Sequence, residues 1–259
     1  MSRIKAAAAL CLTAAAVLAN PAAIGTEDAD LRGLDVTGWD CANQFDGTAQ
    51  SEDAKERNRM KNRWPPGDLS AFPVDALDTA GFLKKVAAYD AILQSQRRGE
   101  LTAAQKDELD RYENQIVSLT GWIVLAYPGP PETTNCGSPI FHDWHLEIFE
   151  NPSDHAPQEG DPTPIICEIT PRTEQRIHRD GIQLQSLAAF LRSPEVTYQA
   201  TGHDACKVRV TGYLLWDDDH NGSADVGSTV QYFSKNGFHH PWRATAWEIH
   251  PVLNIEVIQ

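Results

Sequence analysis

The sequence WRATAWEIHPVLNIEV, residues 242–257, is aromatic, β-branched and alternating, which is typical of a strand that closes a small β-barrel. Trp247 and Ile249 fall on one face of this predicted strand. Glu248 and His250, two residues apart, fall on the other face. The stretch therefore predicts the last strand of the fold and also the first two polar groups of a candidate site.

Four further segments have the composition of strands and precede this one, at residues 115–126, 141–150, 163–169 and 206–216. Between the third and the fourth, residues 180–192 carry apolar residues at helical spacing, namely Leu184, Leu187, Phe190 and Leu191. The order β-β-β-α-β-β is that of the OB-fold. We therefore predict a mainly β protein, with a five-stranded OB-like barrel over residues 115–259 and an α-helical N-terminal extension.

Two glycines support this barrel. Gly121 and Gly212 lie in the middle of predicted strands, in the matching contexts Thr-Gly-Trp and Thr-Gly-Tyr. Glycine inside a strand permits the sharp bend that a small closed barrel needs. We expect both strands to bend at these positions.

The N-terminal region, residues 20–114, is irregular at first and helical later. Capping residues and apolar spacing predict helices at 51–60, 78–97 and 102–114. The last of these begins with Thr102 and Gln105, the capping-box pattern in which each side chain bonds to a free backbone N–H at the start of the helix. The second and third helices are predicted to form a hairpin that packs on the barrel.

Residues 1–19 have the pattern of a secretory signal peptide. Arg3 and Lys5 precede an apolar run at 6–18, and Ala19 ends a small-residue cleavage site, with Ala22 or Ala23 as later options. The run is shorter than the roughly 20 residues of a membrane span, and no other stretch is apolar enough to cross a bilayer. We therefore expect a mature chain that is secreted or periplasmic and has no transmembrane segment.

The chain is acidic, with 22 Lys and Arg residues against 36 Asp and Glu residues and a net charge of −14. Removal of residues 1–19 would delete two basic residues and leave 20 − 36 = −16. Affinity for nucleic acid comes mostly from Lys and Arg that displace counterions from phosphates. This composition therefore disfavours nucleic acid as a partner.

Four cysteines remain after residue 19, namely Cys41, Cys136, Cys167 and Cys206. An even number in an oxidising compartment predicts disulfides, and three pairings are open. We favour Cys41–Cys136, which would tie the N-terminal region to a loop of the barrel. Cys167 and Cys206 would then pair with each other or stay buried as small apolar residues.

Five motifs lie in or directly beside the predicted strands: DWHL at 143–146, EITP at 168–171, VRVTG at 208–212, DDDH at 217–220 and WEIHPV at 247–252. Together they resemble an uncharacterised family of exported bacterial OB-like domains that end in an E-x-H-P-V strand. The resemblance covers about residues 115–257 and implies a fold, not an activity. This chain departs from that pattern by a longer insertion, residues 217–242, before the last strand.

Six polar residues on or beside the strands form a candidate metal site: Asp143, His145, Glu168, His220, Glu248 and His250. The spacing of two within Asp143/His145 and within Glu248/His250 places each pair on one face of a strand. Imidazole and carboxylate ligands suit a divalent metal ion such as zinc, and could also support acid–base catalysis. Equally, these residues could be outer-face positions with ordinary hydrogen-bond partners, because their convergence does not follow from the spacing alone.

Two loops offer further candidate sites. Asp217, Asp219 and Asn221 match the first half of a calcium loop, but Ser228 stands where such a loop needs a bidentate glutamate, and a polar turn explains the same residues. The ligand-binding candidates are His239, His240 and Trp242, which could line a cleft or pack as a loop over the barrel mouth.

These observations predict an exported binding or interaction module on an OB-like barrel, with a small molecule, a glycan or a protein as its ligand. The alternative is a metal-dependent hydrolase that uses the His/Asp/Glu cluster, with zinc or calcium as the ion. Nucleic-acid binding is a third hypothesis that rests on analogy of fold alone.

Overall fold

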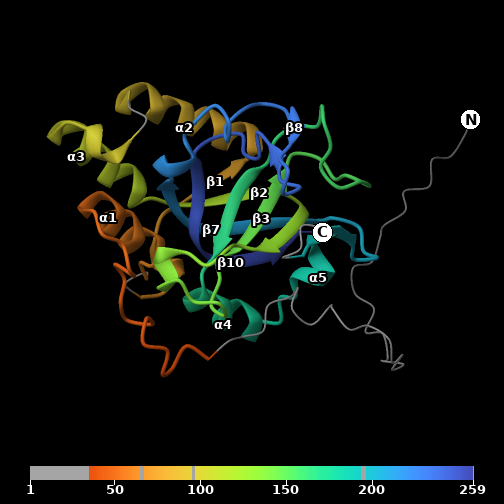
Figure 1. Cartoon of the computed structure of the whole chain (residues 1–259), viewed down its shortest axis with the longest axis horizontal. Helices are drawn as coiled ribbons and strands as arrows, with labels where there is room; N and C mark the ends of the chain where they lie inside the picture. Colours follow the sequence, from red (N-terminus) through yellow and green to blue (C-terminus); the bar gives the residue numbers. More distant parts are fainter. Residues whose placement is uncertain (1–34, 65–66, 95–96, 194–196, 259) are drawn as a thin grey trace, which may run out of the picture.

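The computed structural model describes residues 35–64, 67–94, 97–193 and 197–258. At its centre lies a closed five-stranded barrel, formed by β2 (Ile116–Pro128), β3 (Trp144–Phe149), β4 (Ile165–Ile169), β7 (Cys206–Trp216) and β10 (Trp247–Val257) (Figure 1). The sheet order β3-β4-β10-β7-β2 closes through the β2–β3 pairing. All neighbours are antiparallel except β4 and β10, which run parallel. The predicted OB-like barrel is confirmed.

Short strands extend the sheet beyond the barrel. β1 (Val74–Asp78) pairs in parallel with the first half of β2, and β5 (Phe190–Arg192) pairs with its second half. β6 (Tyr198–Ala200) pairs with β5 in antiparallel orientation. Within the insertion before the last strand, β8 (Tyr232–Phe233) and β9 (His239–His240) form a separate two-stranded hairpin.

The prediction of one helix over 180–192 is wrong in its bounds. The structure has α4 (Pro171–Arg179), a single helical turn α5 (Leu184–Leu187), and then strand β5. α4 begins after Thr170, which caps it, with proline at the first helical position, and it ends before Gly181. A helix still stands between the third and fourth barrel strands, so the topology is unchanged.

The glycines inside the strands are required because other chain segments approach them closely. A Cβ atom on Gly212 would lie 2.3 Å from the carbonyl oxygen of Pro251 in β10, and one on Gly121 would lie 2.5 Å from Cγ2 of Ile148 in β3. Both contacts are between paired, neighbouring strands of the barrel wall. The β7–β10 pairing is also irregular beside Gly212.

The N-terminal region is helical as predicted. It contains α1 (Glu52–Lys61), α2 (Thr79–Leu93) and α3 (Ala103–Glu113), and the Thr102–Gln105 capping box is present. Figure 1 shows α1 and α3 at one side of the barrel, α2 across the top and α4 below. Four 3₁₀ turns complete the described chain, at Leu69–Ala71, Arg98–Glu100, Thr133–Asn135 and Asp218–His220.

A buried arginine fastens the helices to the barrel. Arg98 has no exposed surface and donates to both carboxylate oxygens of Glu113, at 2.9 and 2.7 Å. It also donates to the carbonyl oxygen of Trp216 in β7, and its backbone N–H donates to Asp218. Paired bonds of this kind between charged groups are strong because both partners are ionised.

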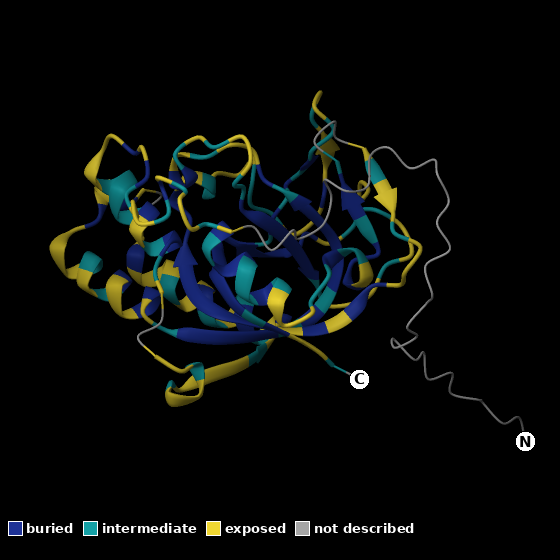
Figure 2. Cartoon of the chain, turned by 90° about the horizontal axis from the view of Figure 1, so that it is seen from below, coloured by how far each residue is buried: buried dark blue, intermediate teal, exposed yellow. Residues whose placement is uncertain are grey.

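The barrel strands bury both of their faces, which is unusual for an antiparallel sheet. One face contributes Leu146, Ile148, Cys167 and Ile249 to the apolar core that fills the barrel. The residues between these point outward and are buried as well, because other parts of the chain cover them. Figure 2 shows the strands as buried, with exposed residues concentrated on the surrounding helices and loops.

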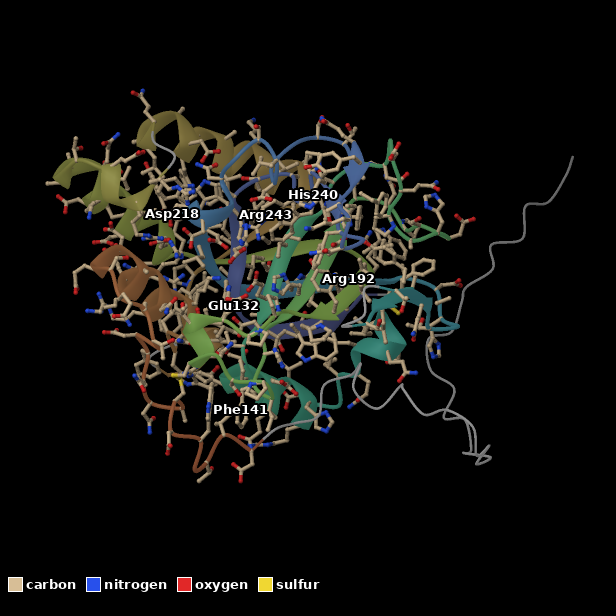
Figure 3. All side chains as sticks on the ribbon, in the orientation of Figure 1. Glu132, Phe141, Arg192, Asp218, His240 and Arg243 are labelled. Carbon is tan, nitrogen blue, oxygen red and sulfur yellow. A yellow bond between two sulfur atoms is a disulfide. The ribbon has the colours of Figure 1, made fainter. Side chains whose placement is uncertain are left out.

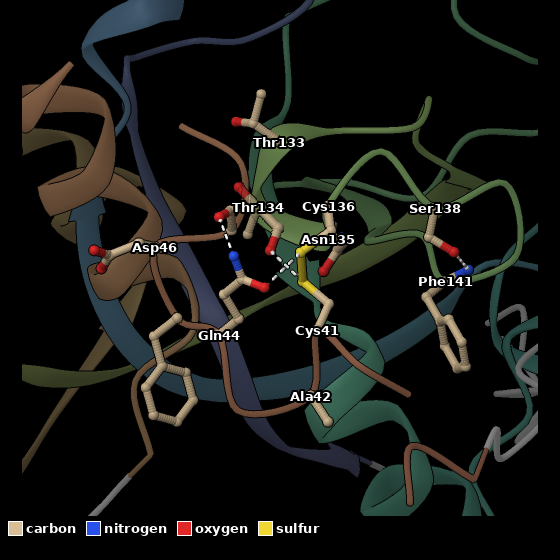
Figure 4. The surroundings of a disulfide bond; sticks show 12 residues. Cys41, Ala42, Gln44, Asp46, Thr133, Thr134, Asn135, Cys136, Ser138 and Phe141 are labelled. Carbon is tan, nitrogen blue, oxygen red and sulfur yellow. Dashed lines mark hydrogen bonds between the residues drawn. A yellow bond between two sulfur atoms is a disulfide. The ribbon is translucent and has the colours of Figure 1, made fainter. Parts of the chain in front are cut away.

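The favoured disulfide is present between Cys41 and Cys136 (Figure 4). Cys167 and Cys206 are buried, and neither forms a disulfide among the described residues. Within the described ranges, no helix is long and apolar enough to span a bilayer. The predicted signal peptide, residues 1–19, lies outside the described residues.

Candidate metal centre

Strands β3, β4 and β10 place a row of polar side chains on the outer face of the barrel. His145 in β3 lies opposite Glu168 in β4, so the two share a face. Asp143 immediately precedes β3, two residues before His145, and therefore points the same way. Glu248 and His250 alternate with the core residues of β10 and also point outward. The predicted strand pairs thus face a common region.

His250 lies at the centre of this region. Its Nδ1 atom is 3.0 Å from Glu248 Oε1 and 3.0 Å from Glu168 Oε2, and its Nε2 atom is 3.7 Å from Asp143 Oδ2. Asp143, Glu168 and His250 each offer one ligand atom, and these atoms lie within 4.8 Å of one another. Ligands bound at about 2.0–2.2 Å to a tetrahedral ion are roughly 3.3–3.6 Å apart, so ligand atoms as far apart as 4.8 Å would have to draw closer around a bound ion.

The three side chains are almost completely buried. Asp143 and His250 are 0 % exposed and Glu168 is 1 % exposed. A side chain with no accessible surface has no water-sized space beside it. Any group that satisfies these atoms must therefore be smaller than a water molecule, as a proton or a bare metal ion is.

Several polar atoms of the cluster have no hydrogen-bond partner among the described residues. They are Asp143 Oδ2, Glu168 Oε2 and His250 Nε2. Leaving a buried polar atom unpaired costs about 1–3 kcal/mol. Asp143 Oδ2 and His250 Nε2 face each other at 3.7 Å, which points to a missing shared partner, whereas Glu168 Oε2 lies 3.0 Å from His250 Nδ1 as an ion-pair contact.

The cluster holds its charges through mutual pairing. Burial would lower the pKa of His250, but the facing carboxylate of Glu168 outweighs it and raises the pKa to about 10. Burial raises the pKa of Asp143 to about 7. Burial would also raise the pKa of Glu168, yet His145, His250 and Lys61 hold it well below its usual range. Without a metal ion, a proton on His250 therefore balances the carboxylate of Glu168.

Glu248 stands behind His250 and is held by an arginine. Its Oε1 atom contacts His250 Nδ1 at 3.0 Å, and its Oε2 atom is 3.1 Å from Arg243 Nη1. The Arg243 guanidinium lies over the Trp242 ring, 3.9 Å from its centroid. A carboxylate that accepts from the second nitrogen of a ligating histidine is a common outer-shell arrangement in metal sites.

Three segments cover this face. Lys61 at the end of α1 lies 3.6 Å from Glu132 and 3.7 Å from Asp217. The loop 129–143 supplies Asn135, which donates to Asp143 Oδ1 at 3.0 Å. The insertion supplies Arg243, and Figure 3 shows Arg243, Glu132 and Arg192 around the central strands. In OB-folds, the outer surface of the second and third strands, with loops at these positions, is where ligands bind.

A second polar group lies further along the same face of β3. Glu147 is fully buried, and its Oε1 atom is 3.5 Å from Nε2 of His239 in the β8–β9 hairpin. His239 Nδ1 lies 3.3 Å from the hydroxyl of Tyr198, which donates to the carbonyl oxygen of Gly237. Burial raises the pKa of Glu147 to about 8 and lowers the pKa of His239 to about 4. Both pKa shifts favour the neutral form of the side chain, so a neutral Glu147 faces a neutral His239 imidazole.

The structure brings together five of the six predicted metal-site residues: Asp143, His145, Glu168, Glu248 and His250. His220 is not among them, because its Nδ1 atom lies 3.1 Å from Asp225 and its ring packs against Trp242. The placement of the insertion depends on tertiary contacts, which spacing in the sequence does not reveal.

The ligand-binding candidates are divided among different contacts. His239 faces Glu147, and His240 stacks on Tyr232. The Trp242 indole N–H donates to Asp225 at 2.9 Å. His240 Nδ1 also lies 3.9 Å from Asp225, so His240 and Trp242 share this partner, whereas His239 contacts Glu147.

The calcium-loop interpretation is not supported by the contacts of its aspartates. Asp217 lies near Lys61 and Arg243, and Asp218 pairs with Arg57 at 2.9 Å. Asp219 pairs with Arg57 and Arg97. Their carboxylates thus meet protein cations, which leaves the polar-turn interpretation of this segment.

Sequence reasoning missed the residues that support the cluster, namely Lys61, Asn135 and Arg243. A lysine at a helix end and an arginine in a loop carry no motif. The one available signal was Arg243 next to Trp242, because arginine stacks on aromatic rings.

Comparison with models of protein families, with curated proteins and with solved structures gives no significant match. The resemblance noted in the sequence therefore stays a prediction.

Proposed function

We propose that the protein binds a divalent transition-metal ion on the outer face of β3, β4 and β10, through Asp143, Glu168 and His250. The convergence of three buried ligand atoms within 4.8 Å supports this proposal most directly. It specifies the ligand of the predicted binding module. Because no water-sized space adjoins Asp143 or His250, a bare ion fits better than an organic molecule.

The donor set favours transition metals over calcium and magnesium. Calcium and magnesium prefer shells made only of oxygen, whereas zinc and iron accept imidazole readily. One nitrogen and two carboxylate ligands, with Glu248 behind the imidazole, therefore favour Zn²⁺ or Fe²⁺.

Metal analysis of protein purified without a histidine tag tests this proposal. We expect about one transition-metal ion per chain, and saturable Zn²⁺ binding in calorimetry after the ion has been removed with a chelator. Absence of both stoichiometric metal and saturable binding would overturn the proposal, and the cluster would then be a buried ion-pair network.

Two ligand variants and one control sharpen this test. Asp143→Asn and His250→Gln should each weaken Zn²⁺ binding by at least about 100-fold, more than the loss of an outer-shell partner costs. His220→Ala removes a histidine that lies outside the cluster, so it should leave the affinity unchanged. Thermal melts without metal report whether each variant is folded.

The alternative of a metal-dependent hydrolase needs an open position on the ion for water. The nearly complete burial of the three ligands favours binding over turnover. The net charge of −14 likewise weighs against a nucleic-acid ligand.

We also propose that the chain is exported. The signal-like residues 1–19 and the Cys41–Cys136 disulfide support this, because structural disulfides persist mainly in oxidising compartments. Cell fractionation, with mass spectrometry of the mature N-terminus, tests it. Protein that is found in the cytosol and still carries residues 1–19 would contradict this proposal.

A further inference from the structure

His145 lies directly beside the proposed metal site and has no hydrogen-bond partner of its own. It is 7 % exposed, and both of its ring nitrogens are buried and unpaired among the described residues. A neutral imidazole carries one donor and one acceptor. Burying both without partners costs about 1–3 kcal/mol each, and a ligand that binds one of these nitrogens would offset part of this cost.

The His145 ring faces a ligand of the proposed site. Its Nδ1 atom is 3.5 Å from Glu168 Oε1, while the other oxygen of Glu168 lies 3.0 Å from His250 Nδ1. Glu168 thus stands between two imidazoles. Because the register places His145 opposite Glu168, this arrangement is built into the β3–β4 ladder.

The surroundings of His145 limit where the ring can move. It stacks on Tyr127 with centroids 5.0 Å apart, and the Trp242 ring lies 6.2 Å away. On the Nε2 side it packs against the backbone of Gly129, where an added Cβ would lie only 2.9 Å from Nε2. The side of the ring that carries Nδ1 is the one that faces the carboxylate.

We infer that His145 is a fourth ligand, so that the ion is held by two imidazoles and two carboxylates from Asp143, His145, Glu168 and His250. This inference rests on the proposed function and specifies the ion as one that accepts a closed shell of four protein ligands. Zn²⁺ takes such a tetrahedral shell in structural sites. A complete shell leaves no position for a reactive water, which separates this site from that of a hydrolase.

X-ray absorption spectroscopy of the Zn²⁺-loaded full chain tests the inference, because it counts imidazole ligands. We expect two imidazoles in the wild-type protein and one in His145→Ala, and intense visible absorption from a tetrahedral Co²⁺ form. His145→Ala should weaken Zn²⁺ binding by at least about 100-fold, more than the loss of an outer-shell partner costs, and His220→Ala should change neither the count nor the affinity.

The outcomes separate this inference from the proposed function. If the wild-type protein binds no metal, the proposed function fails and this inference fails with it. If the wild-type protein binds Zn²⁺ with one imidazole, and His145→Ala keeps its affinity, only the role of His145 is overturned. If His145→Ala does not fold, the imidazole count and Co²⁺ spectrum of the wild-type protein still decide.

Discussion

At the scale of single residues, the outer face of β3 carries several buried polar atoms that lack hydrogen-bond partners among the described residues. Asp143, His145 and Glu147 are buried in a row, and each has at least one polar atom without a hydrogen-bond partner among the described residues. Their spacing of two predicted that Asp143 and His145 share a face, and the same alternation places Glu147 on it. It did not predict that the face is covered, because the covering residues come from distant segments.

Glu147 should make stability depend on pH. Its pKa is raised from 4.5 to about 8, first by burial, so between these values the folded protein holds a proton that the unfolded chain has lost. The free energy of unfolding should therefore fall as pH rises through this window, by at most about 1.4 kcal/mol per pH unit. Glu147→Gln should remove this part of the fall, as urea unfolding at pH 5 to 8 would measure.

Exposed Glu159 provides the control for this prediction. Glu159→Gln should leave the pH dependence of unfolding as it is in the wild-type protein. Parallel stability curves for the wild-type protein and Glu147→Gln would mean that Glu147 is ionised when buried.

Glu248 should act on the metal through His250. Glu248→Ala removes one of the two carboxylates that face His250 Nδ1, so we expect Zn²⁺ affinity to fall by about 10- to 100-fold. Glu248→Gln keeps an acceptor of similar shape and should recover part of that loss. Calorimetric titration of both variants distinguishes this from a ligand role, in which both substitutions would weaken binding equally.

At the scale of elements, the five barrel strands were predictable and the short strands were not. Long runs of β-branched residues marked β2, β7 and β10. β5, at Phe190–Arg192, has apolar residues that continue the helical spacing of Leu184 and Leu187, and its pairing with β2 and β6 makes it a strand. A three-residue strand has too few residues for its period to be recognised.

Gly212 in the barrel wall should not tolerate a side chain. An added Cβ would lie 2.3 Å from the Pro251 carbonyl oxygen, where the backbone cannot give way cheaply. Gly212→Ala should lower the free energy of unfolding by about 2 kcal/mol or more, as overpacking does. Gly222→Ala is the matched control, because nothing lies within 4 Å of that position. Equal stability of the two variants would contradict the close approach.

At the scale of the whole molecule, the site is assembled by segments that are far apart in the sequence. The proposed ligands come from β4, β10 and the residue that precedes β3, and the cover comes from α1, loop 129–143 and the insertion. Sequence patterns predicted the fold class, the disulfide and five of the clustered polar residues. They could not predict the cover, since Lys61 meets Asp217, and Arg243 meets Glu248, only through tertiary packing.

The Cys41–Cys136 disulfide should stabilise this cover. It closes a loop with a sequence separation of 95 residues, and its loss in Cys41→Ser/Cys136→Ser should lower the free energy of unfolding by about 2–5 kcal/mol. Chemical unfolding with and without reductant would measure this. Reductant should not further destabilise the double variant, and an equal effect on both proteins would assign the change to another cause.

The position of β10 beside β4 determines when the proposed metal site can form during folding. Asp143 and Glu168 can lie together as soon as β3 and β4 have paired, but His250 joins them only when β10 inserts between β4 and β7. The ion would therefore be acquired late, after the last barrel strand is in place and in whichever compartment the chain completes its folding. The metal content of the protein would then record the supply of that compartment and not of the place of synthesis.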